Sequence, residues 1–205
     1  MNTVQIRTAL KSDVPALLEI YAPYIRNTSI TFEYDVPSEE EFARRVENIT
    51  KAFPWLLCEI DGKSAGYVYA APYKSRAAFQ WDAELSVYLS PDFHRMGIAT
   101  ALYGCIQAIL KEQGYLNLYT LITVPNPVSI GFHESCGFRP LCVYRGTGFK
   151  FGAWHDLAVL EKQLAPLPQA PKPCKACREL NRAFLEGRFR EAEARIAAAI
   201  AAQTS

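Results

Sequence analysis

Hydrophobic residues alternate with polar ones in the middle of the chain and then switch to a helical spacing. Residues 83–89 alternate and are rich in β-branched and aromatic types, which predicts a strand. Pro91 follows directly, and proline cannot continue a strand ladder. Residues 100–110 then carry an apolar stripe at 102, 105, 106, 109 and 110, which predicts a helix. The pattern therefore predicts a strand, a tight loop and a helix in succession.

The loop between this strand and helix, His94–Ala99, has the features of an anion site. The first N–H groups of a helix lack partners, and the helix dipole favours negative charge there. Gly97 and Ala99 are small enough to let a diphosphate approach the backbone, and Arg95 adds a positive charge. Taken alone, the same pattern also fits an ordinary turn with a glycine at the helix entry.

The rest of the chain predicts a mixed set of strands and helices that would supply a sheet and its covering layers. The expected elements are a strand at 4–7, helices opening at Ser12 and Ser38, a hairpin of strands 55–60 and 64–70 around Asp61-Gly62-Lys63, a strand at 116–124, a short helix from Asn126 to Gly137, and strands at 141–145 and 154–161 joined by residues 146–152.

The composition shifts at Pro166, where four prolines within eight residues indicate a stiff linker. The helical sequence beyond it is broken at Gly187, so we expect two short helices, arranged as a hairpin that packs on the domain or on a partner chain. The expected organisation is a domain over residues 1–165 and an extension over residues 166–205.

Composition narrows the class of protein. The 205 residues are half hydrophobic and carry a net charge near +1, which gives no argument for binding nucleic acid or a membrane. No apolar run is long enough for a membrane helix, and the first residues lack a signal-peptide pattern. Six cysteines lie mostly in apolar segments, so we expect reduced thiols and a cytoplasmic location.

Two motifs carry a resemblance to a known family. His94-Arg95-Met96-Gly97-Ile98-Ala99 resembles the Arg/Gln-x-x-Gly-x-Gly/Ala loop with which GNAT acetyltransferases hold the pyrophosphate of acetyl-CoA, although His94 departs from the usual first residue. Asn126-x-x-Ser129-x-x-x-His133-x-x-x-Gly137-Phe138 resembles the segment that follows the cofactor strand in the same superfamily. The resemblance implies the α/β GNAT fold: one mixed central sheet flanked by helices, here with a short C-terminal helical appendage.

Within the superfamily, the chain is similar to the phosphinothricin and methionine sulfoximine N-acetyltransferases. The matching segments span residues 4–164 and include Ser29-Ile30-Thr31-Phe32, Lys74-x-Arg76, Glu84-x-Ser86-Val87-Tyr88 and Gly148-Phe149-Lys150-x-Gly152-x-Trp154-His155-Asp156. The resemblance implies acetyl-CoA as cosubstrate, no metal, and a small amino-acid-like substrate. Relatives of this kind are often dimers, so the partner it implies is a second copy in a homodimer.

The resemblance also assigns residues to the coenzyme. They are Val87, Tyr88, Leu89, Arg95, Met96, Gly97, Ile98, Ala99, Thr100 and Asn126. It implies that the central strand separates from its neighbour, which leaves the N–H groups of Val87 and Leu89 free to bind the pantetheine arm or to polarise the thioester carbonyl.

Transfer to an amine requires a base and a proton donor. An α-ammonium is charged at neutral pH, so a base must remove a proton, and Glu84 on the central strand is the candidate. The alternative is a surface carboxylate or an ion pair with Arg76. His133 stands where many relatives have a tyrosine that protonates the thiolate, and its alternative is a helix histidine satisfied by Glu134 or by backbone.

We expect the substrate site to combine cationic side chains, which bind a carboxylate, with apolar side chains that line a pocket. Lys74 and Arg76 could bind a carboxylate, with Phe32 and Phe79 as walls of the side-chain pocket. The alternatives are a solvated basic patch and ordinary core packing. Cys174-x-x-Cys177 lacks a second pair of ligands, so we expect free surface thiols there rather than zinc.

Three functions are compatible with these observations. The first is an N-acetyltransferase for the α-amine of a small amino-acid analogue such as phosphinothricin, methionine sulfoximine or methionine sulfone. The second is the same chemistry on another small amine or a protein N-terminus. The third is a non-catalytic CoA-binding sensor whose tail recruits a partner, against which the presence of Glu84 and His133 argues. A scaffolding role of the tail is a further alternative, which deletion after Pro166 would test.

Overall fold

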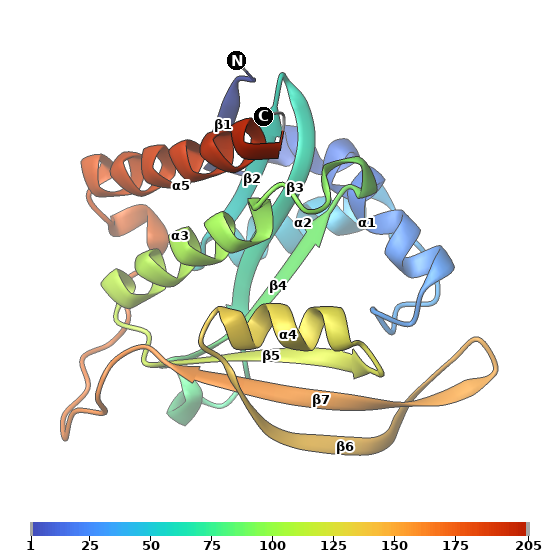
Figure 1. Cartoon of the computed structure of the whole chain (residues 1–205). Coiled ribbons are helices and arrows are strands. Elements are labelled where there is room, and N and C mark those ends of the chain that lie inside the picture. The colour runs from blue at the N-terminus through green and yellow to red at the C-terminus, as the bar shows by residue number, and fades with distance from the viewer. Residues whose placement is uncertain (1, 204–205) are drawn as a thin grey trace.

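A single mixed sheet of seven strands runs through the molecule (Figure 1). The computed structural model describes residues 2–203. The sheet order is β1-β2-β3-β4-β5-β7-β6, and the strands are β1 Val4–Thr8, β2 Trp55–Ile60, β3 Lys63–Pro72, β4 Asp82–Leu89, β5 Asn117–Val124, β6 Arg139–Lys150 and β7 Ala153–Gln163. All neighbouring strands pair antiparallel except β4 and β5, which are parallel.

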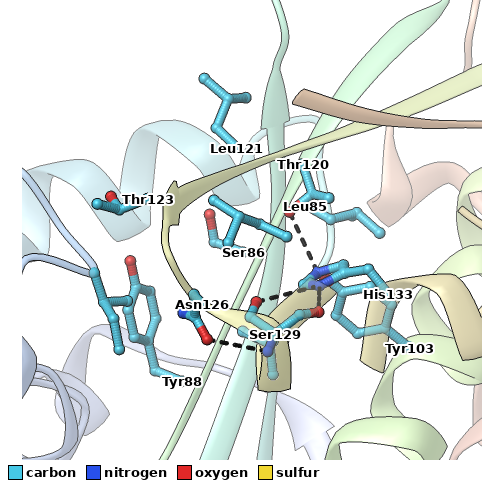
Figure 2. Close-up of a pocket in the computed structure, with 13 residues that line it drawn as sticks. Leu85, Ser86, Tyr88, Tyr103, Thr120, Leu121, Thr123, Asn126, Ser129 and His133 are labelled. Carbon is cyan, nitrogen blue, oxygen red and sulfur yellow. Dashed lines mark hydrogen bonds between the residues drawn. The ribbon is translucent and has the colours of Figure 1, made fainter. Parts of the chain in front are cut away.

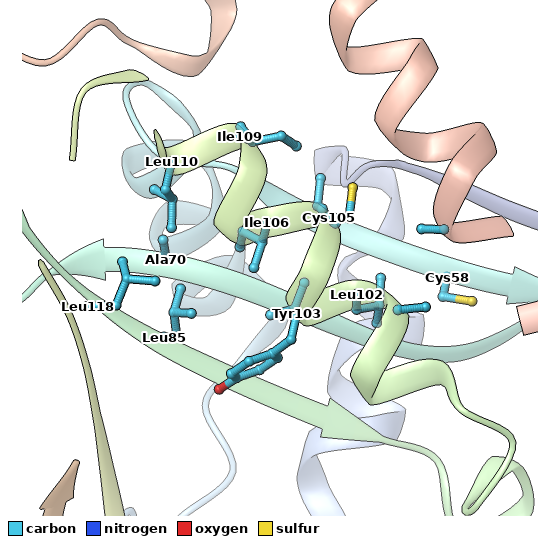
Figure 3. Close-up of a cluster of buried hydrophobic side chains, with 14 of the residues drawn as sticks. Cys58, Ala70, Leu85, Leu102, Tyr103, Cys105, Ile106, Ile109, Leu110 and Leu118 are labelled. Atoms are coloured by element: carbon cyan, nitrogen blue, oxygen red, sulfur yellow. The ribbon is translucent and has the colours of Figure 1, made fainter. Parts of the chain in front are cut away.

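Helices cover both faces of this sheet. They are α1 Val14–Asn27, α2 Glu39–Thr50, α3 Ile98–Gln113, α4 Pro127–Ser135 and α5 Arg182–Gln203. One core joins α1 and α2 to side chains such as Trp55 and Tyr67. The other joins α3 and α5 to the opposite face, where Leu102 and Ile106 of α3 are fully buried against strand residues such as Leu85 (Figure 3). The expected fold class is therefore confirmed.

Local sequence signals explain where several elements begin and turn. Ser38 caps α2 by accepting a hydrogen bond from the Glu41 N–H (3.2 Å), and Asn126 caps α4 in the same way through Ser129 (3.1 Å). The hairpin of β2 and β3 turns at Asp61-Gly62, where both residues have positive φ.

Three sequence expectations were wrong. Ser12 does not cap α1, because a 3-10 turn over Lys11–Asp13 precedes that helix and the Asp13 carboxylate accepts the Leu10 N–H instead. Residues 146–150 are not a connection, because β6 resumes its pairing with β7 after an irregularity and runs to Lys150. The tail forms one helix, α5, which continues through Gly187.

The extension packs on the domain, which was one of the two expected arrangements. α5 lies against α3 and β1 (Figure 1), and Ile196 is fully buried there. Glu193 of α5 accepts a hydrogen bond from the backbone N–H of Ile6 in β1 (2.8 Å). Among the helices of residues 2–203, none combines the length and the apolar character needed to cross a bilayer.

Candidate active site

A pocket lies in the gap that opens between β4 and β5 (Figure 2). The two strands pair only from Asp82–Asn117 to Glu84–Tyr119 and then separate. The pocket is lined by residues 85–88 of β4, residues 120–123 of β5, and Ile30, Tyr103, Asn126, Ser129 and His133. Three residues assigned to the coenzyme, Val87, Tyr88 and Asn126, therefore meet the proposed proton donor His133 in one place.

The open edge of β4 presents backbone donors to this gap. The N–H of Ser90 donates to the Ala65 carbonyl of β3 (3.0 Å). Because backbone groups alternate between the two edges of a strand, the N–H groups of Val87 and Leu89 point to the opposite edge, where β5 has moved away. The Leu89 carbonyl on that edge is occupied, since the Tyr24 hydroxyl donates to it (2.7 Å).

The start of α3 forms the second part of the site. Gly97 is its N-terminal capping residue in the left-handed conformation (φ 75°), and no side chain caps the helix. The N–H groups of Ile98, Ala99 and Thr100 therefore remain available to an anion. Arg95 also has a positive φ (65°), which is uncommon for a residue with a side chain.

Glu84 lies where the strands part. It belongs to the last pair of β4 with β5, and Leu85 and Ser86, which line the pocket, follow it directly. Burial raises the pKa of the Glu84 carboxyl. Within residues 2–203 its carboxylate forms no hydrogen bond or ion pair, so the alternative of an ion pair with Arg76 is absent from the described part of the chain. A partly buried carboxylate without a partner is available as a base.

His133 is buried at the bottom of the pocket with both ring nitrogens engaged (Figure 2). Nδ1 lies 2.7 Å from the Ser129 carbonyl oxygen, which can only accept, so Nδ1 carries the proton. In the neutral ring Nε2 then accepts from the Tyr103 hydroxyl, 2.7 Å away. Burial lowers the pKa of His133, which favours this neutral form.

The sequence analysis missed several pocket residues, among them Tyr103 and Thr123. Tyr103 comes from the apolar stripe of α3, where its spacing indicated only core packing, yet its hydroxyl reaches His133. Thr123 is buried and lines the pocket, and its Oγ1 has no hydrogen-bond partner among the described residues. An unpaired buried hydroxyl is costly, so its position suits a ligand with a polar group. No local signal in β5 would have singled it out.

The four expected substrate residues lie in two places. Phe32 packs against β6, where its ring would lie 2.3 Å from a Cβ added to Gly148. Lys74, Arg76 and Phe79 instead line a hollow beside Pro72 and Asp82, at the ends of β3 and β4, together with Phe53, Tyr115 and Cys174. Lys74 Nζ lies 4.8 Å from the centre of the Phe79 ring there. The structure therefore groups the two cations with Phe79 and separates them from Phe32.

A buried lysine holds the segment that carries Phe32. Lys150, at the end of β6, donates through Nζ to the backbone carbonyls of Ile25 and Thr31, both at 2.8 Å. Burial lowers the pKa of this lysine. The hydroxyl of Tyr34 donates to the Phe149 carbonyl in the same region. These bonds tie residues 25–34 to the hairpin of β6 and β7. Within this segment Ile30 lines the pocket, whereas Phe32 packs against Gly148 of β6.

The remaining candidate groups are the cysteines and the side chains that could bind a metal ion. All six cysteines are free, but Cys177 is buried, so the expectation of two surface thiols was wrong for that residue. Cys177 packs in the core beneath α3 and α5, because its segment folds back onto the domain. In residues 2–203, no three His, Cys, Asp or Glu side chains are grouped so as to hold a metal ion.

Comparison with known families decides the affiliation of this chain. A family model described as an acetyltransferase (GNAT) domain matches residues 6–159, which contain the gap, the loop and α4. This chain belongs to the GNAT acetyltransferases. The motif resemblance of the sequence is thereby confirmed, and so is the assignment of the chain as an acyltransferase.

Individual members of the GNAT family resemble the chain over most of its length. Phosphinothricin N-acetyltransferase of Streptomyces viridochromogenes is 31% identical over 84% of this chain and 93% of its own. The L-methionine sulfoximine/L-methionine sulfone acetyltransferase of Salmonella typhimurium is 28% identical, over 78% and 94%. The crystal structure of a phosphinothricin acetyltransferase from Sinorhizobium meliloti in complex with AcCoA is 30% identical, with a TM-score of 0.78 over 86% of this chain and 100% of that one.

Proposed function

We propose that this GNAT protein transfers the acetyl group of acetyl-CoA to the α-amine of a small amino-acid analogue of the phosphinothricin, methionine sulfoximine or methionine sulfone type. One observation carries the proposal: β4 separates from β5 directly after Glu84, whose partly buried carboxylate has no partner among the described residues, and the same strand leads through a short loop into the free amides at the start of α3. The activities for which the relatives are named, and the AcCoA complex of one of them, support the same choice of cosubstrate and substrate.

The residues present fit acetyl-CoA, which would supply the acetyl group as an activated thioester. The amides of Ile98, Ala99 and Thr100, with Arg95, Met96 and Gly97, would hold its pyrophosphate. The N–H groups of Val87 and Leu89 would bind the arm or the thioester carbonyl, beside Tyr88 and Asn126. The unpaired Thr123 hydroxyl offers a further polar contact in the gap.

Glu84 would act as the general base. Its raised pKa makes it a better proton acceptor than an ordinary carboxylate. It takes the proton of the α-ammonium, directly or through water, and the neutral amine then attacks the carbonyl carbon. The C–S bond breaks as the amide bond forms, and the thiolate leaves.

The thiolate then needs a proton. In the neutral form of His133, Nε2 accepts a hydrogen bond and has no proton to give. His133 would therefore serve as the donor only when it is protonated, and the hydroxyls beside it are those of Tyr103, Thr120 and Ser129. We retain His133 as the proposed acid, with water as the alternative.

Charge and shape would select the substrate. Lys74 and Arg76, in the hollow where β4 begins, would attract the carboxylate, and Phe79 would line this side. Phe32 would wall the side-chain pocket from the other side, held there through Lys150. Because a methylene changes discrimination by only about 1–3 kcal/mol, the preferred side chain has to be found by measurement.

A homodimer is also proposed. β6 ends the sheet order, so its outer edge has no partner strand within the described residues, and its side chains Leu141, Val143 and Tyr144 are exposed. An exposed apolar edge strand suits pairing with the same strand of a second copy about a two-fold axis.

Two measurements test the proposed function. Calorimetric titration with CoA should give one binding event per chain, and absence of heat would overturn the assignment of the gap. Release of free thiol from acetyl-CoA should then rise with phosphinothricin, methionine sulfoximine or methionine sulfone. Binding without release for any amine would identify a sensor, and release only with peptides or other amines would identify the second class of substrate.

A further inference from the structure

The C-terminal part of α5 lies against the loop that precedes α3. Gln203 donates through Nε2 to the Arg95 carbonyl oxygen (2.6 Å). A Cβ built on Gly97 would lie 3.0 Å from the Cβ of Ala199, so the helix and the loop are in close contact. Figure 1 shows the two helices running side by side, with the end of α5 near the start of α3.

This loop needs support from outside itself. Arg95 and Gly97 both have left-handed backbone, and that conformation is unfavourable for arginine. No side chain caps α3, so its own first turn does not supply the missing restraint. Gln203 binds the carbonyl of the residue whose conformation is unusual.

α5 is fixed independently of the loop. Ile196 and Ala192 are buried against the domain, and Glu193 accepts the Ile6 N–H. The position of residues 199–203 is therefore set by contacts one to two turns earlier in the helix. The match to the GNAT family model ends at residue 159, before this helix begins.

We propose that α5 is a positioning element of the coenzyme site, in which Ala199 and Gln203 hold the Arg95–Gly97 loop so that the amides of α3 point at the pyrophosphate. The inference rests on the proposed function, because it assumes that the loop binds coenzyme A. It assigns α5 a role in affinity for the phosphate part of the donor, and none in the transfer step.

The test compares two acetyl donors, acetyl-CoA and S-acetylpantetheine, which lacks the pyrophosphate. Ala199→Leu places a larger side chain against Gly97 and should lower kcat/KM for acetyl-CoA about tenfold, the size expected from an overpacked contact. The value for S-acetylpantetheine and the kcat at saturating acetyl-CoA should stay at the wild-type level. Ala198→Leu is the matched control, since Ala198 is exposed, and it should change neither donor.

Gln203→Ala removes the hydrogen bond from an exposed position. It should also lower kcat/KM for acetyl-CoA relative to that for S-acetylpantetheine, by a smaller factor than Ala199→Leu does. This variant keeps the test decisive should Ala199→Leu fail to fold. An equal loss with both donors, or no loss in either variant, would overturn the proposal while leaving the proposed function intact. Failure of the wild-type protein to bind CoA in the calorimetric titration would instead overturn both.

Discussion

Two ionisable side chains at the site have opposite environments. Glu84 is partly buried without a partner among the described residues, and this burial raises its pKa and its proton affinity. His133 is buried with partners on both nitrogens, and its pKa is lowered. The first arrangement suits a group that exchanges protons with a substrate. The second arrangement holds the imidazole ring in place. Because the lowered pKa disfavours the protonated ring, a role of His133 as an acid requires more than the role of Glu84 as a base.

Glu84→Gln should lower kcat/KM by about 10²–10⁴-fold at neutral pH, the range typical of a lost general base. The loss should shrink toward alkaline pH, where the amine deprotonates by itself, and the acid limb that reports the raised pKa of Glu84 should disappear. Affinity for CoA should change little. The pH profiles of the two proteins provide the measurement.

Glu161→Gln is the matched control for that variant, because Glu161 is a strand carboxylate in a surface ion pair with Arg139. It should retain the wild-type profile. Unaltered kinetics in Glu84→Gln would remove Glu84 from the mechanism.

His133 also makes stability depend on pH. Its pKa is lowered in the folded state, so below about pH 6.5 the unfolded chain binds a proton that the folded chain does not. Stability from this residue is therefore complete above that pH and is lost as the pH falls toward the folded pKa. Relative to His133→Asn, the wild type should lose at most about 1.4 kcal/mol of unfolding free energy per pH unit.

Urea unfolding of both proteins across this pH range measures the difference. Other titrating groups, including Glu84, are common to the two proteins and cancel. Parallel stability curves would contradict the neutral, buried state of the ring.

At the scale of elements, the sequence best predicted those features, such as helix caps and turns, that depend on neighbouring residues. The caps at Ser38 and Asn126 and the turn at Asp61-Gly62 each depend on a few adjacent residues, and the structure contains them as expected. The predicted helix break at Gly187 was wrong because this local signal is overridden by contacts with distant residues. The glycine lowers helix propensity, but contacts of Ile196 and Ala192 with the domain hold α5 as one helix.

Gly187→Ala should therefore stabilise the protein by about 0.5–1 kcal/mol, because alanine is favoured over glycine inside a helix. A Cβ at this position meets nothing within 4 Å, so no clash offsets the gain. Thermal unfolding of the variant gives the measurement. A lower melting temperature would indicate that the chain bends at Gly187 after all.

At the scale of the whole molecule, the sequence predicted the sheet and the gap through family resemblance, while the partners of individual side chains depended on distant segments. His133 meets Tyr103 from another helix, and Thr123 lines the pocket that opens where β4 and β5 diverge. The spacing of residues along the chain predicts neither of these arrangements. The same holds for Lys74 and Arg76, whose hollow includes Cys174 from the tail.

The outer edge of β6 leads to a prediction about assembly. Val143→Lys places a charge on this exposed strand and should convert a dimer into a monomer in sedimentation experiments. Leu167→Lys is the control, since Leu167 is also apolar and exposed but lies outside the sheet. A wild-type monomer, or a dimer that persists in Val143→Lys, would exclude this edge as the interface.

The bond between Ile6 and Glu193 joins the earliest strand to the last helix. Since synthesis proceeds from the N-terminus and domains fold as units, β1 cannot acquire this partner until residue 193 has left the ribosome. The loop at Arg95 is translated long before Gln203, which binds it. A nascent chain that already contains Glu84 and His133 would thus still lack the helix that packs on β1 and on the loop at Arg95, and its maturation would finish only after nearly all of this sequence has emerged.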